Sequence, residues 1–181
     1  MPTFCTAFSA LNRIATGALP DVAHVVKETL DSNPTASVLV FDDATSELIE
    51  LDLRGSVGDV LARLAPPPPA PTTAGRPKLG VVAREVTLLP RHWEWLATQP
   101  GGASVALRKL VEEARKAHAW QDALRQQQES TYRFLSAIAG NLPHFEEATR
   151  ALFANNRDAF TVAMATWPKD IQEHALRLAG D

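Results

Sequence analysis

Cysteine is almost absent from this sequence, which holds only Cys5. A single thiol excludes a disulfide within the chain and any metal site built from several cysteines. No apolar run approaches the roughly 18 residues of a membrane-spanning helix, so we expect no membrane partner. The N-terminus also lacks the basic start and the long apolar stretch of a signal peptide, and we therefore expect a cytoplasmic protein.

The chain also lacks a strong excess of either charge, with 18 Lys and Arg against 21 Asp and Glu. The charges are unevenly distributed: residues 1–65 carry a net −5, residues 66–128 a net +4, and residues 129–181 a net −2. Because nucleic-acid binding depends mainly on local neutralisation of phosphates, only the middle segment has a charge suited to it. A solvated helix face is the alternative explanation for a charge of this size.

Motifs for catalysis are missing as well. The sequence has no glycine-rich phosphate loop and no nucleophile motif, and no two of its five histidines stand four residues apart. His144, Glu146 and Glu147 form the closest cluster, and we expect them in the first turn of a helix, where acids complement the dipole. Asp42 and Asp43 are better explained by a hairpin turn than by metal binding or acid catalysis. We therefore expect no enzyme, no catalytic residue, no metal and no cofactor.

A proline-rich stretch, APPPPAPTTAGRP, marks the clearest boundary in the chain. Consecutive prolines favour an extended spacer, so residues 66–78 are expected to be a linker; a proline-rich ligand for a partner's aromatic groove is the alternative. Residues 1–65 before it are predicted to form a small α+β unit, too small to be stable without packing on something else. Its expected elements are a strand at Thr3–Phe8, a helix from Pro20 to Leu30, paired strands at Ser37–Phe41 and Leu48–Leu53, and a helix at Val57–Leu64 capped by Ser56.

Residues 79–128 are predicted to contain one strand and two helices. The strand is expected at Val81–Leu89 and the first helix at Arg91–Thr98, stopped by Pro100, Gly101 and Gly102. Ser104 is expected to cap a longer helix, which runs on past Trp120, with an apolar face of Leu107, Leu110, Val111 and Ala114. Residues 129–181 are predicted to be a bundle of short helices, a first one at Thr131–Ala139 and three more after an N-cap at Asn141. The whole fold is therefore expected to be α+β.

The middle segment, GRPKLGVVAREVTLLPRHWEWLATQPGGASVALRKLVEEARK, has a polar and basic approach, a strand, a short helix, a turn with glycine, and a capped helix with Arg108 near its start. In this order of elements it resembles ribbon-helix-helix proteins. The whole chain also resembles a bacterial family of unknown function, which implies no activity.

The ribbon-helix-helix resemblance implies a homodimer that binds duplex DNA. In such proteins two chains pair their strands into an antiparallel ribbon that enters the major groove, and the N-terminus of the second helix holds a phosphate. By this resemblance the expected DNA-binding residues are Arg76, Lys78, Arg84, Glu85, Thr87, Arg91, Ala103, Ser104 and Arg108.

The strand allows two registers. If Val86 and Leu88 face the core, Glu85 and Thr87 face DNA and Arg84 lies on the wrong side. If Arg84 faces DNA, Val86 and Leu88 are exposed and Glu85 points inward. An acidic residue on the reading face is unfavourable near phosphates, although it can accept a hydrogen bond from cytosine.

Two functions remain open from the sequence. The leading hypothesis is a dimeric DNA-binding protein, a transcriptional regulator or nucleoid-associated factor. The alternative is a non-catalytic dimeric scaffold for protein interactions that reuses the same fold. Trp93 and Trp95 could stack on bases, but residues two apart on a helix cannot share a face, so Trp93 is expected in the core.

Overall fold

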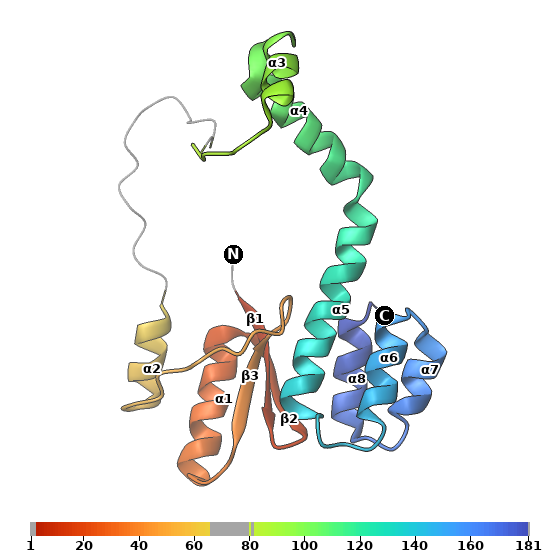
Figure 1. The fold of residues 1–181 in the computed structure, drawn as a ribbon. Coiled ribbons are helices and arrows are strands. Elements are labelled where there is room, and N and C mark those ends of the chain that lie inside the picture. Colours follow the sequence, from red (N-terminus) through yellow and green to blue (C-terminus); the bar gives the residue numbers. More distant parts are fainter. Residues whose placement is uncertain (1–2, 66–79, 81, 181) are drawn as a thin grey trace. The chain divides into compact units, whose positions relative to one another are not determined.

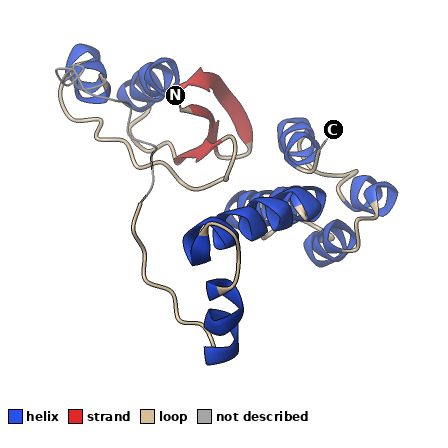
Figure 2. Ribbon diagram, turned by 90° about the horizontal axis from the view of Figure 1, so that it is seen from above, coloured by secondary structure: helices blue, strands red, loops and turns tan. Residues whose placement is uncertain are grey.

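The computed structural model describes residues 3–65, 80 and 82–180. The chain divides into two compact units: unit 1 is Met1–Pro66 with Ala123–Asp181, and unit 2 is Pro67–Asp122. Figure 1 gives the order of the elements, and Figure 2 shows that the described strands lie together near the N-terminus while the other regular elements are helices. This confirms the α+β class. Residues 66–78, the expected linker, lie outside the described residues.

Unit 1 is built on a three-stranded antiparallel sheet in the order β2-β1-β3. The central strand β1 (Phe4–Ser9) pairs with β2 (Asn12–Ala18) on one side and with β3 (Val38–Asp42) on the other. Strands close to β1 and β3 were predicted from their apolar runs. The sequence did not predict β2, because NRIATGA has one large apolar residue, and none of its positions is fully buried.

The strand expected at Leu48–Leu53 does not form. Only Leu48 makes a bridge, to Phe41, supported by backbone hydrogen bonds from Asp42 N to Glu47 O (2.9 Å) and from Ile49 N to Val40 O (2.8 Å). The alternation of apolar and acidic residues in this segment reflects burial of every second side chain, because Ile49, Leu51 and Leu53 pack partly buried against the core. Alternating burial does not require that the segment continue a strand ladder.

Two helices follow the predicted pattern closely. Helix α1 (Leu19–Ser32) has proline in its first turn. Helix α2 (Val57–Leu64) is capped by Ser56, whose hydroxyl accepts from Asp59 N while the Asp59 carboxylate accepts from Ser56 N at 2.8 Å. This reciprocal pair is a capping box, and it confirms the predicted cap.

The C-terminal residues form helices, as expected, but with different boundaries. Helix α5 (Ala119–Ile138) is one continuous helix, whereas a separate helix was expected to start at Thr131. Helix α6 (Phe145–Phe153) has His144, in a left-handed conformation, at its N-cap position, and is not capped by Asn141. Asn156 caps α7 (Arg157–Ala163), and Pro168 precedes α8 (Lys169–Leu178).

The sheet is covered by helices on both faces. On one face, β1 and β3 residues pack with Val22 and Val26 of α1. On the other, Phe8 and Phe41 belong to the same buried cluster as residues of α5 to α8, among them Phe134 of α5. The N-terminal and C-terminal parts of the chain therefore share one core, which gives the small N-terminal sheet the cover that it needs. None of the described helices is long and apolar enough to cross a membrane.

Candidate functional site

Unit 2 contains a pair of helices joined by a tight turn. Helix α3 (Pro90–Ala97) starts at a proline, which has no amide to leave unpaired, and α4 (Gly102–Ala117) follows after four residues. Gly101 and Gly102 in the turn have φ of +84° and +75°, values that L side chains rarely adopt. The predicted first helix and its stop are thus confirmed.

Ser104 is not the cap of α4. The helix begins at Gly102, with Gly101 as the capping residue, so Ser104 already lies in its first turn. The two glycines reverse the chain without side-chain strain, and the helix therefore starts three residues earlier than a cap at Ser104 would give. The backbone amides of Ala103 and Ser104 come before the first intrahelical hydrogen bonds and point out of the N-terminal end.

Arg108 lies beside this helix end. Its Nε donates to the backbone oxygen of Ser104 at 3.1 Å, which holds the guanidinium next to the first turn. Arg108 and Ser104 are both exposed and Ala103 is half-buried. The structure therefore brings together three of the residues predicted to hold a phosphate.

The other predicted DNA-binding residues are not tied to this group. Arg84, Glu85, Thr87 and Arg91 are exposed, and within the described part of unit 2 no hydrogen bond or ion pair joins them to α4. Arg76 and Lys78 lie outside the described residues.

The segment before α3 does not form the expected strand within one chain. Residues 82–89 have no strand pairing, and Leu88 is the one residue among them that is half-buried and not exposed. Val81 is outside the described residues. A ribbon would pair this segment with its copy in a second chain, and a strand without a neighbour has no ladder to join.

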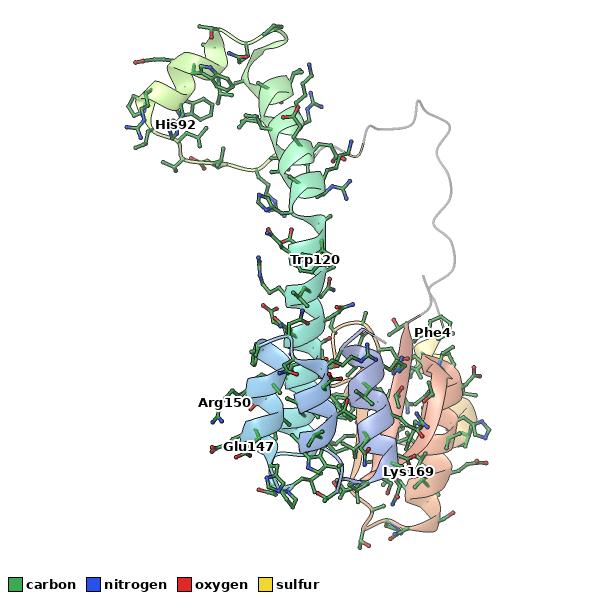
Figure 3. The ribbon with its side chains drawn as sticks, turned by 90° about the vertical axis from the view of Figure 1, so that its right-hand side faces the viewer. Phe4, His92, Trp120, Glu147, Arg150 and Lys169 are labelled. Atoms are coloured by element: carbon green, nitrogen blue, oxygen red, sulfur yellow. The ribbon has the colours of Figure 1, made fainter. Side chains whose placement is uncertain are left out.

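Unit 2 leaves most of its large apolar side chains uncovered. In the described part of the unit, only Leu96 and Ala106 are buried apolar residues. Trp93, expected in the core, is 41% exposed, and Figure 3 shows Trp120 standing out from α5. The prediction that Trp93 lies in the core is wrong for one chain, because α3 and α4 alone do not enclose Trp93 and Trp95. We call the following residues the exposed apolar set: Val82, Val86, Leu89, Trp93, Trp95, Leu110, Val111 and Trp120.

Charges on the second half of α4 neutralise one another. Glu112 is paired with Arg115 (2.9 Å) and lies 3.8 Å from the Lys116 ammonium. The hydrogen bond and charge of Arg115 lower the pKa of Glu112. The positive charge available to a polyanion is therefore concentrated toward the start of α4.

Unit 1 holds a second polar cluster that the sequence did not reveal. Thr6, Asp43, His174 and Arg177 meet where β1, the turn after β3 and α8 come together. Asp43 Oδ1 accepts from the Thr6 hydroxyl at 2.7 Å and from Arg177 Nη2 at 3.1 Å. The same Nη2 donates to His174 Nδ1 at 3.0 Å. Of these four residues, only His174 and Arg177 could be associated from the sequence, because they lie three residues apart on one helix.

His174 is buried beside aromatic rings. Its ring lies 4.5 Å from that of Phe134 and 5.2 Å from that of Phe8, measured between centroids. Burial, and then the charge of Arg177, lower the pKa of His174 to about 4. Because a guanidinium can only donate, Nδ1 accepts and the proton of the neutral ring is on Nε2. This buried Nε2 has no partner among the described residues.

The other candidate clusters have structural roles. Asp42 Oδ1 accepts from the amides of Ala44 and Thr45 at 2.9 Å each, which confirms its predicted role in the turn. His144 Nδ1 lies 3.9 Å from the Glu147 carboxylate at the exposed start of α6. Within residues 3–65, 80 and 82–180, no group of three or more His, Cys, Asp or Glu side chains is arranged to hold a metal ion.

Comparison with known proteins finds one family. A family model described as an uncharacterized protein conserved in bacteria matches residues 4–179, which include both units. No curated protein matches the chain, and no solved structure does.

Proposed function

The chain belongs to the bacterial family DUF2239, whose description names no activity, and from the geometry of unit 2 we propose that it is a homodimer that binds duplex DNA. This family membership agrees with the bacterial family expected from the sequence. The proposed role is that of a transcriptional regulator or nucleoid-associated factor, with no catalytic step.

The exposed apolar set carries the proposal. Trp95 is 50% exposed, Leu110 44% and Val111 64%, in a unit with two buried apolar residues in its described part. Exposure of so many large apolar side chains on a pair of short helices is typical of a surface that another protein covers. A second copy of the same helices offers the same apolar residues in return, as a two-fold interface requires.

Pairing of residues 82–89 with the same residues of the second copy would complete the arrangement. It gives a strand neighbour to a segment whose described residues have no strand pairing in one chain. Leu88 is half-buried, whereas Val86 is 54% exposed in one chain; we propose the register in which the second copy covers both apolar side chains. Glu85 and Thr87 then lie on the outer face of the ribbon.

Exposed positive charge supports DNA as the ligand. Arg84, Arg91 and Arg108 are all exposed, and Arg108 lies beside the free amides at the start of α4. Backbone amides and a guanidinium together suit a phosphate oxygen. A dimer presents each of these groups twice.

One observation favours the alternative, a dimeric protein-interaction scaffold. Glu85 is exposed in the same segment as Arg84, and an acidic side chain on the outer face of a ribbon weakens its attraction to phosphates. The two functions share the dimer and differ in whether duplex DNA binds.

Fluorescence anisotropy of a labelled random-sequence duplex, titrated with the full chain, separates them. We expect binding at low salt that weakens by about three decades between about 50 and 200 mM salt, if about six phosphates are contacted. Arg84→Ala and Arg108→Ala should each weaken binding while the dimer is kept. Arg150→Ala changes an exposed arginine of α6 in unit 1 and is the matched control.

No binding at tens of micromolar protein would reject the DNA function and favour the scaffold. If the Arg84→Ala, Arg108→Ala and Arg150→Ala variants all bind DNA equally strongly, unit 2 is not part of the DNA-binding surface.

A further inference from the structure

A polar pocket lies in unit 1 next to the cluster of Thr6, Asp43, His174 and Arg177. Its volume is about 270 Å³, below the range of about 300–1,000 Å³ typical of sites for drug-sized ligands. Its polar lining comes from Asp43, Gln126, Gln127, Ser130 and Arg177. The size suits a small molecule, and the lining suits a polar one.

The two charged residues of the pocket, Asp43 and Arg177, are held in place by hydrogen bonds to buried side chains. Thr6 is fully buried and His174 is 1% exposed, and both are hydrogen-bonded to the ion pair of Asp43 and Arg177. Two buried polar side chains thus fix the carboxylate and the guanidinium. Groups held by buried partners are preorganised, so a ligand does not have to order them.

Each charged group keeps unused hydrogen-bonding capacity. The contacts of Arg177 all involve Nη2, so Nη1 and Nε have no partner among the described residues. Asp43 uses Oδ1 for both of its side-chain contacts, which leaves Oδ2 without one there. The Asp43 side chain is 15% exposed and that of Arg177 46%.

We propose that this pocket binds a small zwitterion of the amino-acid type, with its carboxylate on Arg177 and its ammonium group on Asp43. The Nε–H and Nη1–H groups of Arg177, which have no partner among the described residues, can each donate a charge-assisted hydrogen bond to a carboxylate oxygen. The free carboxylate oxygen of Asp43 accepts from an ammonium group. A ligand with one charge of each sign leaves the neutral ion pair neutral, whereas a simple anion would face repulsion from Asp43.

The neutral residues of the lining fit the rest of such a ligand. The side chains of Gln126 and Gln127 can both donate and accept hydrogen bonds. Gln127 also packs closely against Gly180, where an added Cβ would lie 2.9 Å from its Nε2. Ala123 and Leu178 add an apolar wall. This assignment does not depend on DNA binding, because the residues that form the pocket all belong to unit 1.

Thermal unfolding of the full chain in the presence of single proteinogenic L-amino acids tests the proposal. A ligand that binds only the folded state raises the melting temperature in proportion to the logarithm of its excess over Kd. We expect at least one amino acid to do so, and its N-acetylated and C-amidated forms to lose the effect, because each lacks one of the two charges. Acetate alone should have no comparable effect.

Arg177→Lys keeps the charge but removes the Nε and Nη1 donors, and should weaken binding of that amino acid at least tenfold in calorimetric titration. Gln126→Ala changes an exposed side chain and should weaken it less. Arg13→Lys is the matched control. Arg13 lies outside the pocket and is ion-paired with Asp170 and Glu173 of α8, the helix that also carries Arg177.

The proposal is overturned if no free amino acid stabilises the chain, or if the blocked forms or acetate do so equally well. It is also overturned if Arg177→Lys binds as tightly as Arg13→Lys.

Discussion

His174 illustrates at the scale of one residue how unit 1 combines an apolar core with a polar cluster. Its ring is part of the aromatic packing around Phe134, and its Nδ1 is part of the hydrogen bonding around Arg177. A buried imidazole of this kind is stable in the core only when neutral, because a positive charge there would be desolvated and close to a guanidinium.

Protonation of His174 should therefore destabilise unit 1. Its pKa falls from 6.5 to about 4 on folding, so between these values the unfolded chain binds more protons and stability decreases as the pH falls. The full effect is up to about 3 kcal/mol, at 1.36 kcal/mol per pKa unit. Urea unfolding of the full chain from pH 7 to pH 4 measures it. His174→Gln should reduce the pH dependence over this range, and an unchanged dependence would contradict the buried neutral ring.

Gly101 is the residue on which the turn between α3 and α4 depends. Gly101→Ala places a Cβ 3.2 Å from the side-chain carbons of Val105, at a φ of +84°. We expect the variant to lower the stability of the turn by about 1–3 kcal/mol. Hydrogen exchange of the α3 and α4 amides should show the loss as faster exchange.

A helical glycine of the same chain is the control for that substitution. Gly58 lies inside α2, and an added Cβ would meet only Ser56 Oγ at an ordinary 3.6 Å. Gly58→Ala should stabilise α2 by about 0.5–1 kcal/mol. Equal behaviour of the two variants would show that the conformation of Gly101 is not required.

At the scale of elements, α3 and α4 are incomplete as a folded structure. Helix α4 carries Leu107, Leu110 and Val111, and all of its residues beyond Leu107 are exposed in one chain. In proteins most helix stability comes from packing of an apolar face, so we expect another surface to cover this pair of helices.

A charge in the exposed apolar set should therefore prevent association. Val111→Glu should turn a dimer into a monomer without unfolding unit 1, because the side chain is 64% exposed in one chain. Val162→Glu, on α7 of unit 1 and 73% exposed, is the matched control and should leave the dimer intact. Sedimentation velocity measures both. If neither variant dissociates, the interface lies elsewhere. If both dissociate, the effect of the added charge is nonspecific.

The sequence predicted most helices because their signals are local. Proline at the start of α3, the glycines before α4 and the Ser56–Asp59 capping box act within a few residues. It did not predict β2 or the end of the strand ladder after Leu48, because pairing depends on a neighbour that local pattern does not specify. The exposure of Trp93 was missed for the related reason that burial depends on what else covers a helix face.

The polar cluster of unit 1 could not be predicted for a different reason. Thr6, Asp43 and Arg177 are separated by long stretches of chain, and each has an ordinary local explanation on a strand, in a turn or on a helix surface. Only packing of α8 against the sheet brings them together. By contrast, Arg108 and Ser104 were expected together because both belong to one helix.

At the scale of the whole molecule, a compact unit with its own core is joined to a unit without one. Unit 1 buries aromatic side chains from β1, β3, α5 and α7, whereas the described part of unit 2 buries only Leu96 and Ala106 as apolar residues. This contrast leads to the central claim, that unit 2 is completed by a second copy of the chain. DNA binding by unit 2 and ligand binding by unit 1 are separate proposals.

The molar mass of the full chain in solution, measured by light scattering after size-exclusion chromatography, tests this claim most directly. One chain has a mass of 19.7 kDa. We expect twice that value at micromolar concentration, in low and in moderate salt alike, because the proposed interface is built from apolar side chains, whose association is not screened by ions. A mass of one chain at tens of micromolar would contradict the claim.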